Sequence, residues 1–375
     1  MDAQLAPINL PPTFNNLPIE LQDIIISHLG QYDLSICICV CRTWKDYFHH
    51  HLWKHIELTW RILDKPWQEN IGESLKAHGH LIQTLILKSN DMWLLHFFLE
   101  YSPTNFPSLT TVEVRAPLEC YKDEEFARFL DLSSAGWKRL CFLQTGEFDS
   151  IIDIRSQFAK ALLKHTGTLE VVRMHCKTGM DWRAVDELLC MAPHLKQVFF
   201  YGDYQTRRGG WMEAATIVGS NWICDNLEIF GYQIGGIPRP DITRNIRNRP
   251  VSDSATPGAL QKSIALQRQI YAKLARLTKL RQLTLGFPPA ETQLAYALEF
   301  PPGTTRHWSL GILDKDTRGQ FNCLAMTVES GLDLLKGLTE LRTVDLRYME
   351  VYVHHEKEQR WFKENWPLAK ILTTD

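Results

Sequence analysis

Cysteine and histidine are the residues of this chain best able to bind a metal or act as nucleophiles. Cys37, Cys39 and Cys41 alternate in a stretch with helical periodicity, and residues two apart on a helix point to different faces. They do not converge on one metal ion, so we interpret them as small apolar residues of a helical core. The histidines nearby lack a cysteine or carboxylate at ligand spacing. They are His49, His50, His51 and His55.

No combination of residues indicates catalysis. His175 and Cys176 are adjacent in a predicted strand, where neighbouring side chains diverge. The chain has no phosphate-binding glycine loop, no H-E-x-x-H and no G-x-S-x-G. Two charge clusters, 123–125 and 354–356, are typical of solvated faces. We therefore predict a non-enzymatic protein with no catalytic residue, no metal site and no cofactor.

Composition indicates an ordinary globular protein. Of 375 residues, 45% are hydrophobic and 22% charged, and the net charge is −2. That charge gives no general attraction to nucleic acid or to anionic membranes. No apolar run is long enough to span a bilayer, and residues 1–14 resemble a disordered lead rather than a secretory signal. Nine scattered cysteines fit reduced thiols, which predicts a cytoplasmic or nuclear location, or both.

Short helices are predicted from Leu17 to Ile56. Pro18 suits a first helical turn, and Gly30 suits the end of that helix. Asp33 and Thr43 are candidate N-caps for a second and a third helix. A unit of about 40 residues rarely stabilises itself, so its surplus of apolar residues suggests a face for another protein. Periodicity alone leaves open the alternative that these residues are the core of a helical cap.

The order of residues in this segment resembles an F-box. The matching elements are Leu17-Pro18-x-Glu20, Asp33-Leu34, Val40-Cys41-Arg42, Trp44, Leu52-Trp53 and Ile56. The resemblance implies a three-helix module, at 15–58, that binds a Skp-type adaptor and through it a cullin–RING ubiquitin ligase. Trp44 and Trp53 would pack the module onto itself and onto the rest of the chain. The residues implied to form or support the adaptor-binding surface are Leu17, Pro18, Leu21, Ile24, Leu29, Leu34 and Val40.

The pattern apolar-x-x-apolar-x-apolar recurs through residues 59–375. The first six intervals are 26 to 32 residues, apart from one of 53 residues. Its alternating positions predict half-buried strands, and helical stretches lie between the copies. The copies begin at Ile82, Leu109, Trp137, Leu169, Leu195, Leu227, Leu280 and Leu341, with a degenerate ninth at Thr305-Trp308-Leu310.

This alternation resembles a divergent leucine-rich repeat, and the first copy also has the asparagine of that motif, Asn90. The predicted fold class is therefore α/β: a three-helix F-box followed by an irregular leucine-rich-repeat solenoid with strands on the concave face and helices on the convex face. An ordinary α/β domain with buried parallel strands is the alternative. Residues 235–263, rich in proline and arginine, are predicted to be a disordered insertion.

In such a solenoid, the strand residues between the buried ones line a recognition surface. Arg173, Phe199 and Tyr201 are our candidate substrate contacts, since arginine and aromatic side chains often anchor interfaces. Together these resemblances predict the substrate-recognition subunit of a Skp–cullin–F-box ubiquitin ligase, with an unidentified protein target. The alternative is an interaction scaffold whose F-box joins no cullin ligase.

Overall fold

The computed structural model describes residues 14, 17–58, 65–88, 99, 106–115, 123–142, 154–176, 180–202, 211–240, 258–285, 324–346 and 355–373. Asn90 and the degenerate ninth copy at Thr305 lie outside these residues.

Three helices form the N-terminal module, as expected: α1 (Ile19–Ser27), α2 (Gln31–Cys37) and α3 (Arg42–Lys54). Its small core is made by Ile26, Leu34 and Phe48. The ring of Trp44 packs at its edge, 5.4 Å from that of Phe48. Trp53, on the same helix, packs instead against the main core of the protein. The two tryptophans thus pack the module onto itself and onto the rest of the chain, as predicted.

The predicted helix boundaries in this module need correction. Helix α1 ends at Ser27, and Gly30 is the N-cap of α2 rather than the end of α1. Asp33 lies one turn inside α2, where its carboxylate accepts a hydrogen bond from the Gly30 N–H at 3.1 Å. Thr43 is the second residue of α3, whose N-cap is Cys41. In both helices the carboxylate or hydroxyl expected at the cap lies within the helix instead.

A parallel sheet of ten strands dominates the rest of the chain, and its spatial order follows the sequence. All eight non-degenerate copies of the repeat form strands, which confirms that prediction. The strands are β1 (His55–Leu58), β2 (Thr84–Leu87), β3 (Thr111–Val114), β4 (Arg139–Phe142), β5 (Val171–Cys176), β6 (Gln197–Gly202), β8 (Ile229–Gly231), β10 (Gln282–Thr284), β11 (Thr343–Asp345) and β12 (Lys370–Leu372). A separate pair is formed by β7 (Trp211–Glu213) and β9 (Gln233–Gly235).

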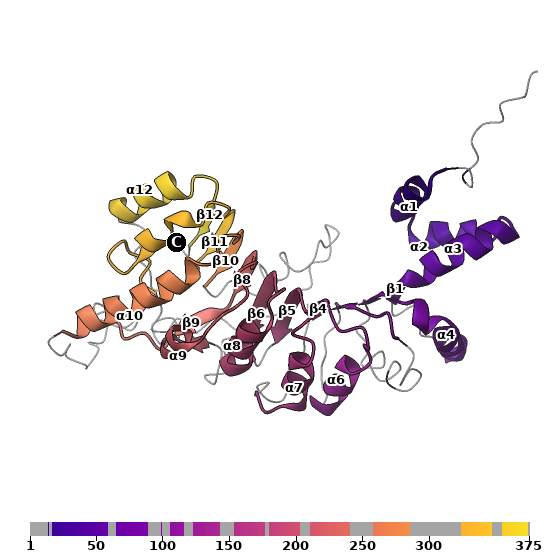
Figure 1. Ribbon diagram of the computed structural model, residues 1–375, viewed down its shortest axis with the longest axis horizontal. Helices are drawn as coiled ribbons and strands as arrows, with labels where there is room; N and C mark the ends of the chain where they lie inside the picture. The colour runs from indigo at the N-terminus through magenta and orange to yellow at the C-terminus, as the bar shows by residue number, and fades with distance from the viewer. Residues whose placement is uncertain are drawn as a thin grey trace, which may run out of the picture.

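Helices connect successive strands and lie together on one side of the sheet (Figure 1). This arrangement confirms the predicted solenoid with strands on its inner face and helices outside. The connecting helices are α4 (Lys65–His78), η3 (Gly79–Leu81), α6 (Asp123–Leu130), α7 (Gln157–Leu163), α8 (Trp182–Met191), α9 (Ala214–Gly219), α10 (Ala259–Leu274), η5 (Leu332–Gly337) and α12 (Glu356–Asn365).

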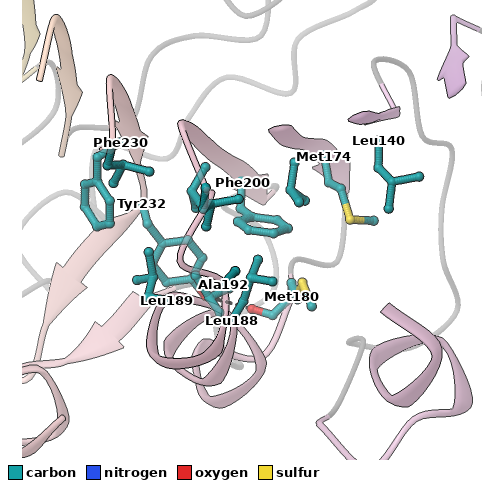
Figure 2. Packing of buried hydrophobic residues seen from close by; sticks show 14 of the residues in the cluster. Leu140, Met174, Met180, Leu188, Leu189, Ala192, Phe200, Phe230 and Tyr232 are labelled. Carbon is teal, nitrogen blue, oxygen red and sulfur yellow. Dashed lines mark hydrogen bonds between the residues drawn. The ribbon is translucent and has the colours of Figure 1, made fainter. Parts of the chain in front are cut away.

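The core lies between the sheet and these helices. Figure 2 shows Phe200 and Tyr232 directed from the strands towards Leu188 and Leu189 of α8. The Phe200 and Tyr232 rings meet edge to face at 6.1 Å, and the Tyr232 hydroxyl donates to the Met180 carbonyl at 2.7 Å. That hydrogen bond satisfies a buried hydroxyl, so the large ring can sit in the core without an unpaired polar atom.

Elements of the structure do not stop at the boundaries predicted at 58 and at 235–263. Strand β1 ends the F-box segment but pairs with β2, so residues 55–58 belong to both units. Gly235 ends β9, residues 236–240 follow it with Ile237 buried, and α10 already contains residues 259–263. Ile237 at one end of the proposed insertion and Ser263 at the other are buried and therefore anchor it in the fold. Residues 241–257 lie outside the described residues, and their disorder stays a prediction.

Partly desolvated histidines predict loss of stability in mild acid. Burial is the main cause that lowers the pKa of His51 and His55 in the N-terminal module and of His165 in the solenoid. The unfolded chain then binds more protons than the folded one as pH falls through about 6.5, so folding is weakened. We expect a lower thermal midpoint at pH 5.5 than at pH 7.5. A variant with all three replaced by glutamine should show a smaller difference; an equal difference in that variant would contradict this cause.

Candidate docking surfaces

Helix α1 turns most of its apolar side chains away from the core. Of its large apolar residues only Ile26 is buried, whereas the polar Gln22 is buried beside it. The Gln22 side-chain amide donates to the Leu17 carbonyl at 2.8 Å, so its burial leaves that donor satisfied. A helix that buries a glutamine and exposes isoleucines has its apolar surface arranged for a partner rather than for its own core.

Large apolar side chains are also exposed along α2 and in the turn after it. Tyr32 and Val40 expose 77% and 60% of their surface, and Ile36 exposes half. We call the exposed large hydrophobic residues of this module the apolar set. Its members are Ile19, Leu21, Ile24, Ile25, Tyr32, Ile36 and Val40. Single exposed apolar residues are common on protein surfaces. Seven within 22 consecutive positions are concentrated in one part of the chain, which is typical of an interaction surface.

The structure divides the predicted adaptor-binding residues into two groups. Leu21, Ile24 and Val40 belong to the apolar set, and Pro18 is exposed beside them. Leu34 is 6% exposed and lies in the module core, and Leu29 packs against that core. The role of Leu29 and Leu34 is therefore to support the helices. Leu17 is half-buried and belongs to neither group. Sequence reasoning missed Ile19, Ile25, Tyr32 and Ile36, although all four are apolar.

The second surface is the open face of the sheet, formed by strand side chains that alternate with the core. One row crosses its centre as Glu113, Cys141, Arg173, Phe199 and Gly231, each the Cα partner of the next. The structure thus brings Arg173 and Phe199 together, on β5 and β6, as the sequence predicted. Tyr201 lies two residues along β6, but its side chain is outside the described residues.

The Phe199 ring can lie over the neighbouring strand because Gly231 has no side chain. A Cβ atom at Gly231 would overlap the Phe199 ring, with its Cε2 only 2.8 Å away. The ring is half-buried and covers the open face of β8. Further along the row, Thr284 and Asp345 are each 1% exposed. Asp345, which by alternation would face a ligand, is therefore not accessible.

A cleft of about 490 Å³ lies between the N-terminal helices and the first strands. Asp23, His51, Lys54 and Glu57 line it together with apolar residues. Within the described part of the chain, no three His, Cys, Asp or Glu side chains are grouped closely enough to hold a metal ion. No described helix combines the length and the apolar character needed to cross a membrane.

Comparison with known proteins identifies the first unit. The F-box-like family model matches residues 14–59, which contain all three helices and β1. A solved leucine-rich-repeat protein of Leptospira interrogans aligns with 87% of this chain and 91% of its own, at 14% identity and a TM-score of 0.27, too low to support an argument. No curated protein matches the chain.

These observations define an F-box-containing protein with a leucine-rich-repeat-like solenoid. The apolar set of the F-box-like domain and the open face of the sheet are both suited to protein interaction. The class of protein rests on the family match at 14–59 and on the arrangement of the strands, rather than on likeness to any single protein.

Replacing one residue of each group should separate surface from core. Leu34→Ala should lower the free energy of unfolding by about 3 kcal/mol, because it leaves a cavity in a small core. Ile24→Ala, at a side chain 54% exposed, should change it by less than about 0.5 kcal/mol. Urea denaturation measures both. Comparable losses in the two variants would contradict the placement of Ile24 on the surface.

The contact between Gly231 and Phe199 predicts a coupling that a double-mutant cycle can measure. Gly231→Ala should cost about 1–3 kcal/mol by displacing the ring, and much less when Phe199 is already alanine. Gly167→Ala is the control, since a Cβ there meets no atom within 4 Å. Additive effects of Gly231→Ala and Phe199→Ala would show that the ring does not lie over β8.

Proposed function

We propose that this protein is the substrate-recognition subunit of a Skp–cullin–F-box ubiquitin ligase. The observation that carries the proposal is the apolar set, exposed within a domain that matches the F-box-like family. F-box domains generally bind Skp-type adaptors, and an adaptor that covers these side chains would remove them from water. The gain would be about 25 cal/mol for each Å² of apolar surface buried.

The small module core makes such a partner plausible on energetic grounds. Only Ile26, Leu34 and Phe48 are buried in it, whereas seven large hydrophobic residues stay exposed. A module with so few fully buried apolar residues gains little from its own packing. Its attachment to the solenoid through Trp53 and β1 contributes stability from one side, and an adaptor would contribute it from the other.

In this function the chain supplies position rather than chemistry. The adaptor would connect the F-box to a cullin–RING assembly, and the open face of the solenoid would hold a target protein. Target lysines would then lie near the charged ubiquitin-conjugating enzyme at a raised effective concentration. The protein would act in the cytoplasm, the nucleus or both, where its cysteines stay reduced.

A charge placed in the apolar set should prevent adaptor binding. Leu21→Glu should weaken binding to a purified Skp-type adaptor at least tenfold, because a carboxylate would be buried without a partner. Met191→Glu is a matched control on α8, because Met191 is 45% exposed and Leu21 46%. Isothermal titration calorimetry measures both. Equal affinity of Leu21→Glu and the wild type would exclude this surface as the interface.

Recruitment of the ligase is a separate step with its own readout. Affinity purification of the wild type from cells should recover a cullin together with the adaptor, and Leu21→Glu should recover neither. If the adaptor is recovered without a cullin, the ligase function is refuted and the protein is an adaptor-bound scaffold.

A further inference from the structure

Two arginines lie next to each other on the open face, and no described carboxylate forms an ion pair with either of them. Arg139 on β4 is the Cα partner of Val171 on β5, and Arg173 on β5 is the Cα partner of Cys141 on β4. The two arginines are therefore diagonal neighbours on one face of the sheet. Both side chains are half-buried. Burial raises the pKa of the Cys141 thiol between them, although both guanidinium groups act against it and Arg139 hydrogen-bonds the sulfur. The thiol therefore stays neutral and does not balance the arginines.

Several other charged side chains on or beside the sheet form ion pairs. Two of these ion pairs join residues that come just before strands in the chain: Lys196 with Glu170 at 2.6 Å, and Arg281 with Glu340 at 3.3 Å. On the open face itself, Lys88 pairs with Glu57 at 2.7 Å. Glu113 pairs with Arg115, the residue directly after β3. Arg139 and Arg173 differ from these residues, because both are half-buried on the open face and neither is in an ion pair among the described residues.

Among the described residues, neither arginine of the pair forms an ion pair. The guanidinium of Arg173 donates instead to the neutral Gln197 amide at 3.0 Å. Burial lowers the pKa of Arg173, because it disfavours the charged form. An arginine nevertheless stays protonated at neutral pH, so two partly desolvated positive charges remain at the centre of the face.

We propose that the open face binds an acidic segment of a partner protein, with carboxylates on Arg139 and Arg173 and an apolar side chain against Phe199. Guanidinium groups bind carboxylates through paired, charge-assisted hydrogen bonds, which strengthen in a partly desolvated setting. Phe199 is the Cα partner of Arg173 and its ring lies over Gly231, so an apolar side chain adjoins the charges. Arginine beside an aromatic ring is a common arrangement in residues that dominate binding.

Carboxylates fit this site better than phosphate or nucleic acid. Cys141 on β4 has two Cα partners: Arg173 on β5 and Glu113 on β3. Glu113 therefore adds a negative charge beside the two arginines. That charge repels a dianionic phosphate more strongly than a carboxylate. A nucleic acid would need a basic stripe, whereas Lys88 and Arg115 on this face are paired with carboxylates and the whole chain carries −2.

This inference rests on the proposed role of the open face in holding a target, and it can be tested without an adaptor. The probes are fluorescein-labelled pools of random decapeptides with two central positions fixed as Glu, Gln or phosphoserine. Fluorescence polarisation with the full-length protein should show the Glu pool binding several-fold more tightly than the Gln pool. Arg139→Gln/Arg173→Gln should reduce binding of the Glu pool about tenfold and abolish the preference.

Two controls distinguish this site from general charge and from unfolding. Lys138→Gln/Lys196→Gln also removes two positive charges, but at the strand starts, and should keep the preference. Arg139→Lys/Arg173→Lys keeps the charges and should keep part of it. Loss of the preference in the Lys138/Lys196 variant, no preference in the wild type, or preference for the phosphoserine pool would each overturn the proposal.

The peptide assay and the adaptor assay fail independently. An acidic preference in a protein that binds no adaptor refutes the ligase function but leaves the site in place. Adaptor binding without an acidic preference refutes the site alone.

Discussion

The passage of α3 directly into β1 is the constraint on which the rest of the structure depends. Helix α3 ends at Lys54 and β1 begins at His55, so no linker separates the F-box-like domain from the sheet. Strand β1 pairs with β2 over four residues, and its Ile56 and Leu58 join the main core. Trp53 packs against the same core from the helix. The orientation of the N-terminal helices is therefore set by the same packing that begins the solenoid.

That attachment explains how one chain can present two surfaces in fixed relation. A flexible linker would let the apolar set and the open face sample many separations, and the effective concentration of a bound target would fall. A continuous sheet holds both surfaces on one body instead. The irregular length of the repeats does not interrupt the sheet, because each strand pairs with the next through the whole row from β1 to β12. The wide interval after β8 leaves that pairing unbroken, since β8 still pairs with β10.

Strand positions were predictable because the inward residues of each repeat are large and apolar. Val112, Val172 and Val198 are fully buried, as their alternation indicated. Strand β1 was missed because it has only two inward residues and comes after a helical pattern; β12 was missed because its side chains are only half-buried. Helix caps were misplaced because glycine at position 30 and cysteine at position 41 serve where a carboxylate or a hydroxyl was expected.

The candidate sites were predictable only in part, for two physical reasons. Periodicity identifies apolar residues but not which of them lack neighbours, so Leu34 and Ile24 appeared equivalent although one is core and the other surface. Arg173 and Phe199 were found by alternation within their strands. Arg139 was not, because its relation to Arg173 depends on the register between β4 and β5, which a single strand's pattern does not contain.

The central claim is that the apolar set is the surface that an adaptor covers. Hydroxyl-radical footprinting of the full-length protein, alone and with a purified Skp-type adaptor, tests it most directly at single side chains. The account predicts that Leu21, Ile24, Ile25, Tyr32 and Ile36 lose reactivity in the complex, while Met191 and Leu260 on the solenoid keep theirs. Unchanged reactivity across the N-terminal helices in a complex that has formed would contradict it.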